Sequence, residues 1–215
     1  KHEAVIEAAD AASIYEVPLI MMRENLDVIC LKKLNITNFK EPELSKWKEF
    51  LDKLKYPKSK VNIGLIGKYI ELQDAYKSIL EAFVHAGAMN ECKVDVINIH
   101  SEFITDANVD EKLAGLDGLL VAPGFGHRGI EGKIIAVKFA RENKLPFFGI
   151  CLGMQMSVIE FGRDVLKLED AHSTEMNPAC ANPVIDLMEE QKKVTAKGGT
   201  MRLGSYPCAI QPGTL

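Results

Sequence analysis

Strands and helices alternate along the chain from Val61 onward, and this alternation limits the fold more than any other feature of the sequence. Apolar runs predict buried strands at 61–67, 93–99, 116–121 and 146–150, and helical patterns lie between and after them at 74–85, 132–142 and 152–161. Such alternation is typical of an α/β fold with a parallel, doubly wound sheet. Ligands of these sheets bind beyond the carboxyl ends of the strands.

The residues before Val61 have a different composition, because all 16 glycines of the chain lie after residue 60. A shift of this kind indicates a domain boundary. Between Glu41 and Pro57, apolar side chains recur at steps of three and four, as in an amphipathic helix that begins near Pro42 and ends before Pro57. A single helix has no core of its own, so this stripe must pack on another element.

The composition excludes several classes of protein. With 47% hydrophobic residues in 215, the chain can bury a core, and its net charge of −4 gives no field for holding nucleic acid. The sequence has no apolar run of about 18 residues and no signal-peptide pattern, so we expect a cytoplasmic protein without a membrane partner. The five cysteines contain no C-x-x-C, and we expect neither disulfides nor a metal site.

The segment Gly149-Ile150-Cys151-Leu152-Gly153 is the most informative motif. A G-x-C-x-G in which an apolar strand turns into a helix has the form of a nucleophile elbow, which holds a strained residue with its side chain exposed. The N-terminus of the following helix favours a thiolate. We therefore interpret Cys151 as a nucleophile. The alternative is a buried structural cysteine, since free cysteine is among the most buried residue types.

A thiol that attacks a carbonyl needs donors for the oxyanion. The N–H of Leu152 follows the nucleophile directly, and the loop at 123–126 follows the preceding strand, where Gly124 lets the backbone approach a ligand closely. The alternative for the segment 122–132 is a flexible surface loop. Arg128, between two glycines, points either to an anionic ligand or into solvent.

A thiolate mechanism also needs a base, usually a histidine. The chain has five, and none carries a strong signature: His2, His85, His100, His127 and His172. The residues alone therefore do not identify a catalytic base.

Several strings resemble the glutaminase domain of the CTP synthase family, a class I glutamine amidotransferase. They are Gly67-Lys68-Tyr69-Ile70-Glu71-Leu72-Gln73-Asp74-Ala75-Tyr76-Lys77-Ser78, the loop from Gly124 to Lys133, Phe148-Gly149-Ile150-Cys151-Leu152-Gly153-Met154-Gln155, Ser173-Thr174-Glu175 and the segment from Gly198 to Gly204. Residues 1–35 are similar to the end of the synthetase (amidoligase) domain, and 36–60 to the linker helix between domains. By this resemblance, residues 61–215 correspond to a flavodoxin-like glutaminase domain that is incomplete at its C-terminal end.

The resemblance implies that this part hydrolyses glutamine and supplies ammonia for the ATP-dependent amination of UTP to CTP. When the roles of the family's residues are carried over to this sequence, Cys151 forms a glutamyl thioester, and the N–H groups of Gly124 and Leu152 form the oxyanion hole. Glutamine is held by these two residues with Phe125, Gln155 and Glu175, and Arg128 belongs to a lid that responds to GTP. ATP and Mg²⁺ are expected in the synthetase domain and no cofactor in this part. The family implies a homotetramer.

Two features depart from the family pattern. Pro123 stands where many members have a glycine, and the His-Pro-Glu segment that carries the family's catalytic histidine and glutamate does not occur in the sequence. We therefore expect a fragment of a longer enzyme with little or no glutaminase activity alone. The alternatives are another flavodoxin-like cysteine hydrolase of the γ-glutamyl hydrolase type, or a module that binds glutamine or GTP without turnover.

Overall fold

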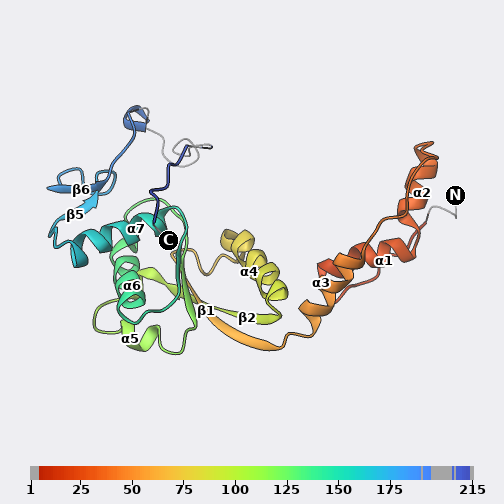
Figure 1. Ribbon diagram of the computed structural model, residues 1–215, viewed down its shortest axis with the longest axis horizontal. Helices are drawn as coiled ribbons and strands as arrows, with labels where there is room; N and C mark the ends of the chain where they lie inside the picture. Colours follow the sequence, from red (N-terminus) through yellow and green to blue (C-terminus); the bar gives the residue numbers. More distant parts are fainter. Residues whose placement is uncertain (1–4, 190, 195–204, 206, 214–215) are drawn as a thin grey trace. The chain divides into compact units, whose positions relative to one another are not determined.

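The computed structural model (Figure 1) describes residues 5–189, 191–194, 205 and 207–213. The chain divides into two compact units. One comprises the residues up to Val61 together with Ser78–Val94, and the other comprises Asn62–Lys77 and the residues from Asp95 onward. The three domains expected from the sequence stay a prediction.

A four-stranded sheet in the order β2-β1-β3-β4 forms the centre of the fold. The strands are β1 (Ser59–Gly67), β2 (Cys92–His100), β3 (Gly118–Val121) and β4 (Phe147–Gly149). β3 pairs in parallel with both β1 and β4. A parallel pair requires a crossover, and the helix α6 (Ile130–Glu142) supplies the one between β3 and β4. The parallel α/β architecture expected from the sequence is therefore confirmed.

The register of these strands brings their carboxyl ends together. Ile66 on β1 is the partner of Val121 on β3, and Val121 is the partner of Gly149 on β4. The segments that follow the three strands therefore start at one edge of the sheet. They carry Lys68, the loop from Ala122 and Cys151.

The core of the second unit, which comprises Asn62–Lys77 and the residues from Asp95 onward, lies between the strands and two helices. These helices, α6 and α7 (Leu152–Glu160), pack against each other and against β4. Buried side chains come from β1, β3, α6 and α7, among them Ile66, Leu119, Val121, Ile134, Val137, Met156 and Ile159, and the partly buried Phe147 of β4 packs against them. After α7 the chain makes a π-helical turn at Phe161–Val165 and a small parallel sheet of β5 (Ala171–Ser173) and β6 (Asn182–Ile185).

The other unit contains the predicted amphipathic helix as α3 (Ser45–Lys55), with α1 (Val17–Arg23), α2 (Leu26–Lys33) and α4 (Lys77–Met89). The apolar side of α3 contacts Tyr15. The Trp47 indole N–H donates to the Tyr15 carbonyl at 2.9 Å, and the ring centroids of Tyr15 and Phe50 are 5.3 Å apart. The Tyr15 hydroxyl lies 2.7 Å from His85 of α4 and donates to Glu81.

Two sequence-based expectations differ from the structure. The helix expected at 74–85 is divided into a 3-10 turn at Gln73–Tyr76 and α4 from Lys77. The sequence also suggests a strand around 206–210 after a turn at 198–204. Residues 207–210 are in no helix or strand, whereas Tyr206 and the turn lie outside the described residues.

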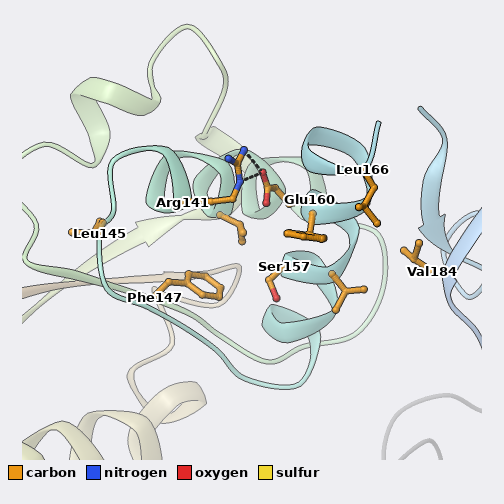
Figure 2. Close-up of a pocket in the computed structure, with 11 residues that line it drawn as sticks. Arg141, Leu145, Phe147, Ser157, Glu160, Leu166 and Val184 are labelled. Carbon is orange, nitrogen blue, oxygen red and sulfur yellow. Dashed lines mark hydrogen bonds and ion pairs between the residues drawn. The ribbon is translucent and has the colours of Figure 1, made fainter. Parts of the chain in front are cut away.

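An ion pair between a buried carboxylate and an exposed guanidinium connects α6 to α7, as Figure 2 shows. Arg141 on α6 donates from Nε to Glu160 Oε1 at 2.8 Å, and its Nη2 lies 2.7 Å from the same oxygen. Glu160 is 1% exposed. The pair borders an apolar cavity of about 470 Å³, lined also by Leu145, Phe147, Leu166 and Val184. Because the Glu160 carboxylate is removed from water, Arg141 is the cation that offsets the cost of its burial.

We expect Glu160→Gln to lower the free energy of unfolding by about 2 kcal/mol, because the charge-assisted hydrogen bond between Arg141 and the buried carboxylate is replaced by a weaker bond to a neutral amide. Glu142→Gln is the matched control, since Glu142 contacts the same guanidinium at 3.3 Å but its side chain is 52% exposed. It should cost less than about 1 kcal/mol. Urea unfolding measures both values, and equal losses in the two variants would contradict the assignment.

Candidate active site

Cys151 connects the carboxyl end of β4 to α7 through a strained turn. Its φ is 53° and its ψ is −106°, a combination that residues other than glycine rarely adopt. The side chain is exposed. The structure therefore shows, at this position, the strand-to-helix elbow that the motif predicted.

Close backbone packing explains the two glycines of the elbow. A Cβ on Gly153 would lie 2.2 Å from the Val121 carbonyl oxygen, and a Cβ on Gly149 would lie 2.6 Å from the Gly153 carbonyl carbon. The Ile150 N–H donates to the same Val121 oxygen at 3.1 Å. The end of β3 therefore supports the turn and leaves no room for a side chain on Gly153, and the start of α7 leaves none for a side chain on Gly149.

A cavity of about 570 Å³ opens beside Cys151. It brings together the nucleophile candidate and all five residues that the resemblance assigned to glutamine: Gly124, Phe125, Leu152, Gln155 and Glu175. They come from the β3–α6 loop, the first turns of α7 and the segment after β5. The remaining wall is formed by Met176, Ile185, Asp186, Leu187, Met188 and nearby residues. The apolar cavity of Figure 2, in contrast, contains no cysteine in its lining.

Arg128 lies outside the lining of this cavity. Its Nε is 3.0 Å from Glu102 Oε1, and its guanidinium lies 5.6 Å from the centroid of the Tyr69 ring. The side chain is 53% exposed. The structure thus pairs Arg128 with other protein groups at the surface, and its role in a lid stays a prediction.

Among the described residues, no histidine lines the cavity that holds Cys151. His85 bonds to a tyrosine hydroxyl in the other unit, His100 stacks on a phenylalanine ring, and His127 is exposed. The pKa of His172 is lowered, mainly by burial and next by the neighbouring Arg163. The sequence identified no base, and these positions supply none at the thiol.

Two lysines that donate to carbonyls of the β3–α6 loop were not identified as site residues from the sequence. The Lys133 ammonium donates to the Ala122 carbonyl at 3.1 Å, and the Lys68 ammonium donates to the Phe125 carbonyl. Lys133 is 0% exposed and Lys68 6%. Burial, and next the nearby Lys68 cation, lower the pKa of Lys133 to about 8, although Cys151 acts in the opposite direction.

A signal for Lys133 was present in the sequence. Lys133 occupies the same helical stripe as Ile130, Ile134 and Val137, which are all buried. A lysine on the apolar face of a helix conflicts with the pattern. Such conflicts concentrate at functional sites.

Lys133 should make the stability of the protein depend on pH. Its pKa of about 8 in the folded chain lies below the ordinary value of 10.5, so the folded state binds fewer protons between these values. The contribution of Lys133 to the free energy of unfolding therefore rises as the pH increases from 8 to 10.5. Below pH 8, the buried charge of Lys133 lowers the free energy of unfolding by its full amount, about 3 kcal/mol.

We therefore expect Lys133→Met to stabilise the protein more at pH 7 than at pH 10, because methionine carries no charge to bury. The difference between variant and wild type in the free energy of unfolding measures this effect, since other titrating groups cancel. Lys138→Met is the control: Lys138 lies on the same helix, and its pKa is raised by its bond to Asp164. An equal effect of Lys133→Met at both pH values would disprove the assignment.

Within the described part of the chain, no group of three or more His, Cys, Asp or Glu side chains is placed to hold a metal ion. A search of the same residues finds no helix with the length and apolarity needed to cross a membrane.

Comparison with known protein families gives one match over most of the chain. The family described as "Glutamine amidotransferase class-I" matches residues 71–214. This range contains Cys151 and every residue of the cavity lining.

Curated relatives named "CTP synthase" are similar over the whole chain. That of Flavobacterium johnsoniae is 64% identical over 215 residues, and that of Chlorobaculum parvum is 55% identical over 213. The chain spans only 40% and 38% of their lengths. Among solved structures, the glutaminase domain of Trypanosoma brucei CTPS with bound acivicin is 39% identical, with a TM-score of 0.56 over 60% of this chain and 50% of that one.

Proposed function

Because the chain belongs to the class-I glutamine amidotransferases, we propose that Cys151 attacks the side-chain amide of glutamine. The observation that carries this proposal is the strained, exposed Cys151 in a cavity that also contains Gly124 and Leu152. The fold brings the Cys151 thiol and the backbone of Gly124 and Leu152 to one edge of the sheet. This is the arrangement that acyl transfer requires.

In the proposed reaction, the Cys151 sulfur forms a bond to the amide carbon, and the carbonyl oxygen becomes an oxyanion. The N–H groups of Gly124 and Leu152 stabilise this charge. The first N–H groups of a helix have no partner within the helix, so Leu152 is suited to the task. The C–N bond then breaks, ammonia leaves with the thiol proton, and water hydrolyses the thioester to glutamate.

Gly124 is not required by the packing of the protein itself. A Cβ there would meet Leu152 Cδ2 and Lys68 Cε at 3.7 Å, which is ordinary van der Waals contact. Gly124 instead lines the cavity beside Cys151, where it presents backbone without a side chain. This supports a close approach of substrate to the backbone at this position.

Three side chains of the wall complete the proposed glutamine site. The Glu175 carboxylate pairs with the α-ammonium of the substrate, a charge-assisted contact. Phe125 packs on the aliphatic part, and Gln155 on the first turns of α7 offers both a donor and an acceptor.

For the whole protein, we propose that the released ammonia aminates UTP to CTP with ATP and Mg²⁺, in a cytoplasmic homotetramer. The similarity to curated CTP synthases over the full chain supports this. It also disfavours the alternative of a γ-glutamyl hydrolase. GTP activation acts, in this proposal, through the loop that carries Arg128.

A second candidate is binding of glutamine without turnover. It is favoured by the cavity lining, which contains no histidine among the described residues. We accordingly propose that the 215-residue chain alone hydrolyses glutamine slowly, since loss of a general base costs several orders of magnitude in rate.

The nucleophile can be tested without turnover. We expect acivicin to label Cys151 at least about tenfold faster than Cys30, because both thiols are exposed but only Cys151 lies beside a site for the amino-acid part. Mass spectrometry of the two cysteine peptides gives both rates from one sample. Equal labelling of the two would refute the assignment.

The role of Glu175 gives an independent prediction. We expect Glu175→Gln to raise the acivicin concentration for half-maximal labelling rate about tenfold, because a charge-assisted bond to the ammonium is lost. Iodoacetamide, which has no ammonium, should alkylate Cys151 at an unchanged rate. Glu169→Gln is the control, since Glu169 is exposed outside the cavity lining. An unchanged acivicin concentration for half-maximal labelling rate in Glu175→Gln would contradict the assignment of Glu175 to the substrate site.

A further inference from the structure

Lys133 is the most deeply buried cation in the part of the chain that the structure describes, and it lies beside the proposed site rather than in it. We propose that Lys133 is a positioning residue: its ammonium holds the segment 122–126, here called the oxyanion loop, so that the Gly124 N–H meets the developing oxyanion. This inference rests on the proposed function, because it assigns a task to that loop.

The oxyanion loop is fixed on both sides of Gly124. The Ala122 N–H donates to the Ile66 carbonyl at 2.9 Å, which continues the pairing of β3 with β1. Lys133 then holds the Ala122 carbonyl at 3.1 Å, and Lys68 holds the Phe125 carbonyl. Gly124 lies between these two anchored carbonyls.

Pro123 reduces the remaining freedom. Its ring fixes φ near −65°, so with the Ala122 carbonyl held in place few rotations remain before the Gly124 N–H. The Lys133 ammonium also lies close to that residue, since a Cβ on Gly124 would be 4.0 Å from Lys133 Nζ. An anchored, preorganised donor stabilises transition-state charge without a reorganisation cost.

The burial of a charge at this position needs an explanation, because an apolar residue would suit the helix face better. Ile130, Ile134 and Val137 surround Lys133 on the same stripe of α6. The lowered pKa of Lys133 reflects the cost of this burial. Residues that reduce stability in a site commonly serve function there.

The test compares two reactions at the same sulfur. Acivicin carries a chloro-substituted C=N group: the Cys151 sulfur bonds to that carbon, negative charge develops on the ring nitrogen, and the C–Cl bond then breaks, with chloride leaving and the thiol proton passing to solvent. Iodoacetamide reacts by direct displacement of iodide and develops no such charge. The oxyanion loop should therefore matter for the first reaction only.

For Lys133→Met in the full 215-residue chain, we expect the acivicin rate at Cys151 to fall at least about fivefold, whereas the iodoacetamide rate stays within about twofold. Thermal unfolding checks that the variant is folded. Lys138→Met, on the same helix but 38% exposed in an ion pair with Asp164, should leave both rates unchanged.

The outcomes separate the inference from the function on which it rests. An unchanged acivicin rate in Lys133→Met, or an equal fall in both rates, would overturn the role of Lys133 and leave Cys151 as the nucleophile. Wild-type protein that acivicin does not label at Cys151 would overturn the proposed function and the inference with it. A fall in the acivicin rate alone supports both.

Discussion

The parallel register of β1, β3 and β4 is the constraint on which the site depends. Because Ile66, Val121 and Gly149 are neighbours across the sheet, the segments that follow these strands start together. Residues separated by more than 80 positions in sequence thereby meet at one edge. A slip of one residue would turn the side chains of a strand to the opposite face and separate these segments.

Two of the buried charged residues in the second unit, Glu160 and Lys133, have opposite kinds of partner. Glu160 has a cationic partner in Arg141, and their bond joins α6 to α7. Lys133 is held by the Ala122 carbonyl, and after burial the main cause that lowers its pKa is another cation, Lys68. The first arrangement stabilises the fold, whereas the second reduces stability. The costly charge lies next to Cys151, where chemistry is proposed, and the paired one borders an apolar cavity.

The sequence was most informative where structure is decided locally. The elbow at Cys151 follows from two glycines between an apolar strand and a helix, and its backbone angles agree. The alternation of strands and helices also predicted the parallel α/β class and the positions of four strands along the chain. The sequence was less informative where structure depends on distant partners: Arg128 pairs with Glu102, and residues 207–210, although partly apolar, are not in a strand.

The two proposed donors of the oxyanion hole are held in different ways, and this decides where the site is sensitive. The Leu152 N–H belongs to the first turn of α7, so the hydrogen bonds of a helix set its direction. The Gly124 N–H belongs to a loop without a hydrogen-bonded ladder, and side chains from outside the loop must set its direction. Both lysines that do so are buried and flank the glycine. The direction of the proposed donors beside Cys151 therefore depends on side-chain hydrogen bonds to backbone carbonyls as much as on the sheet itself.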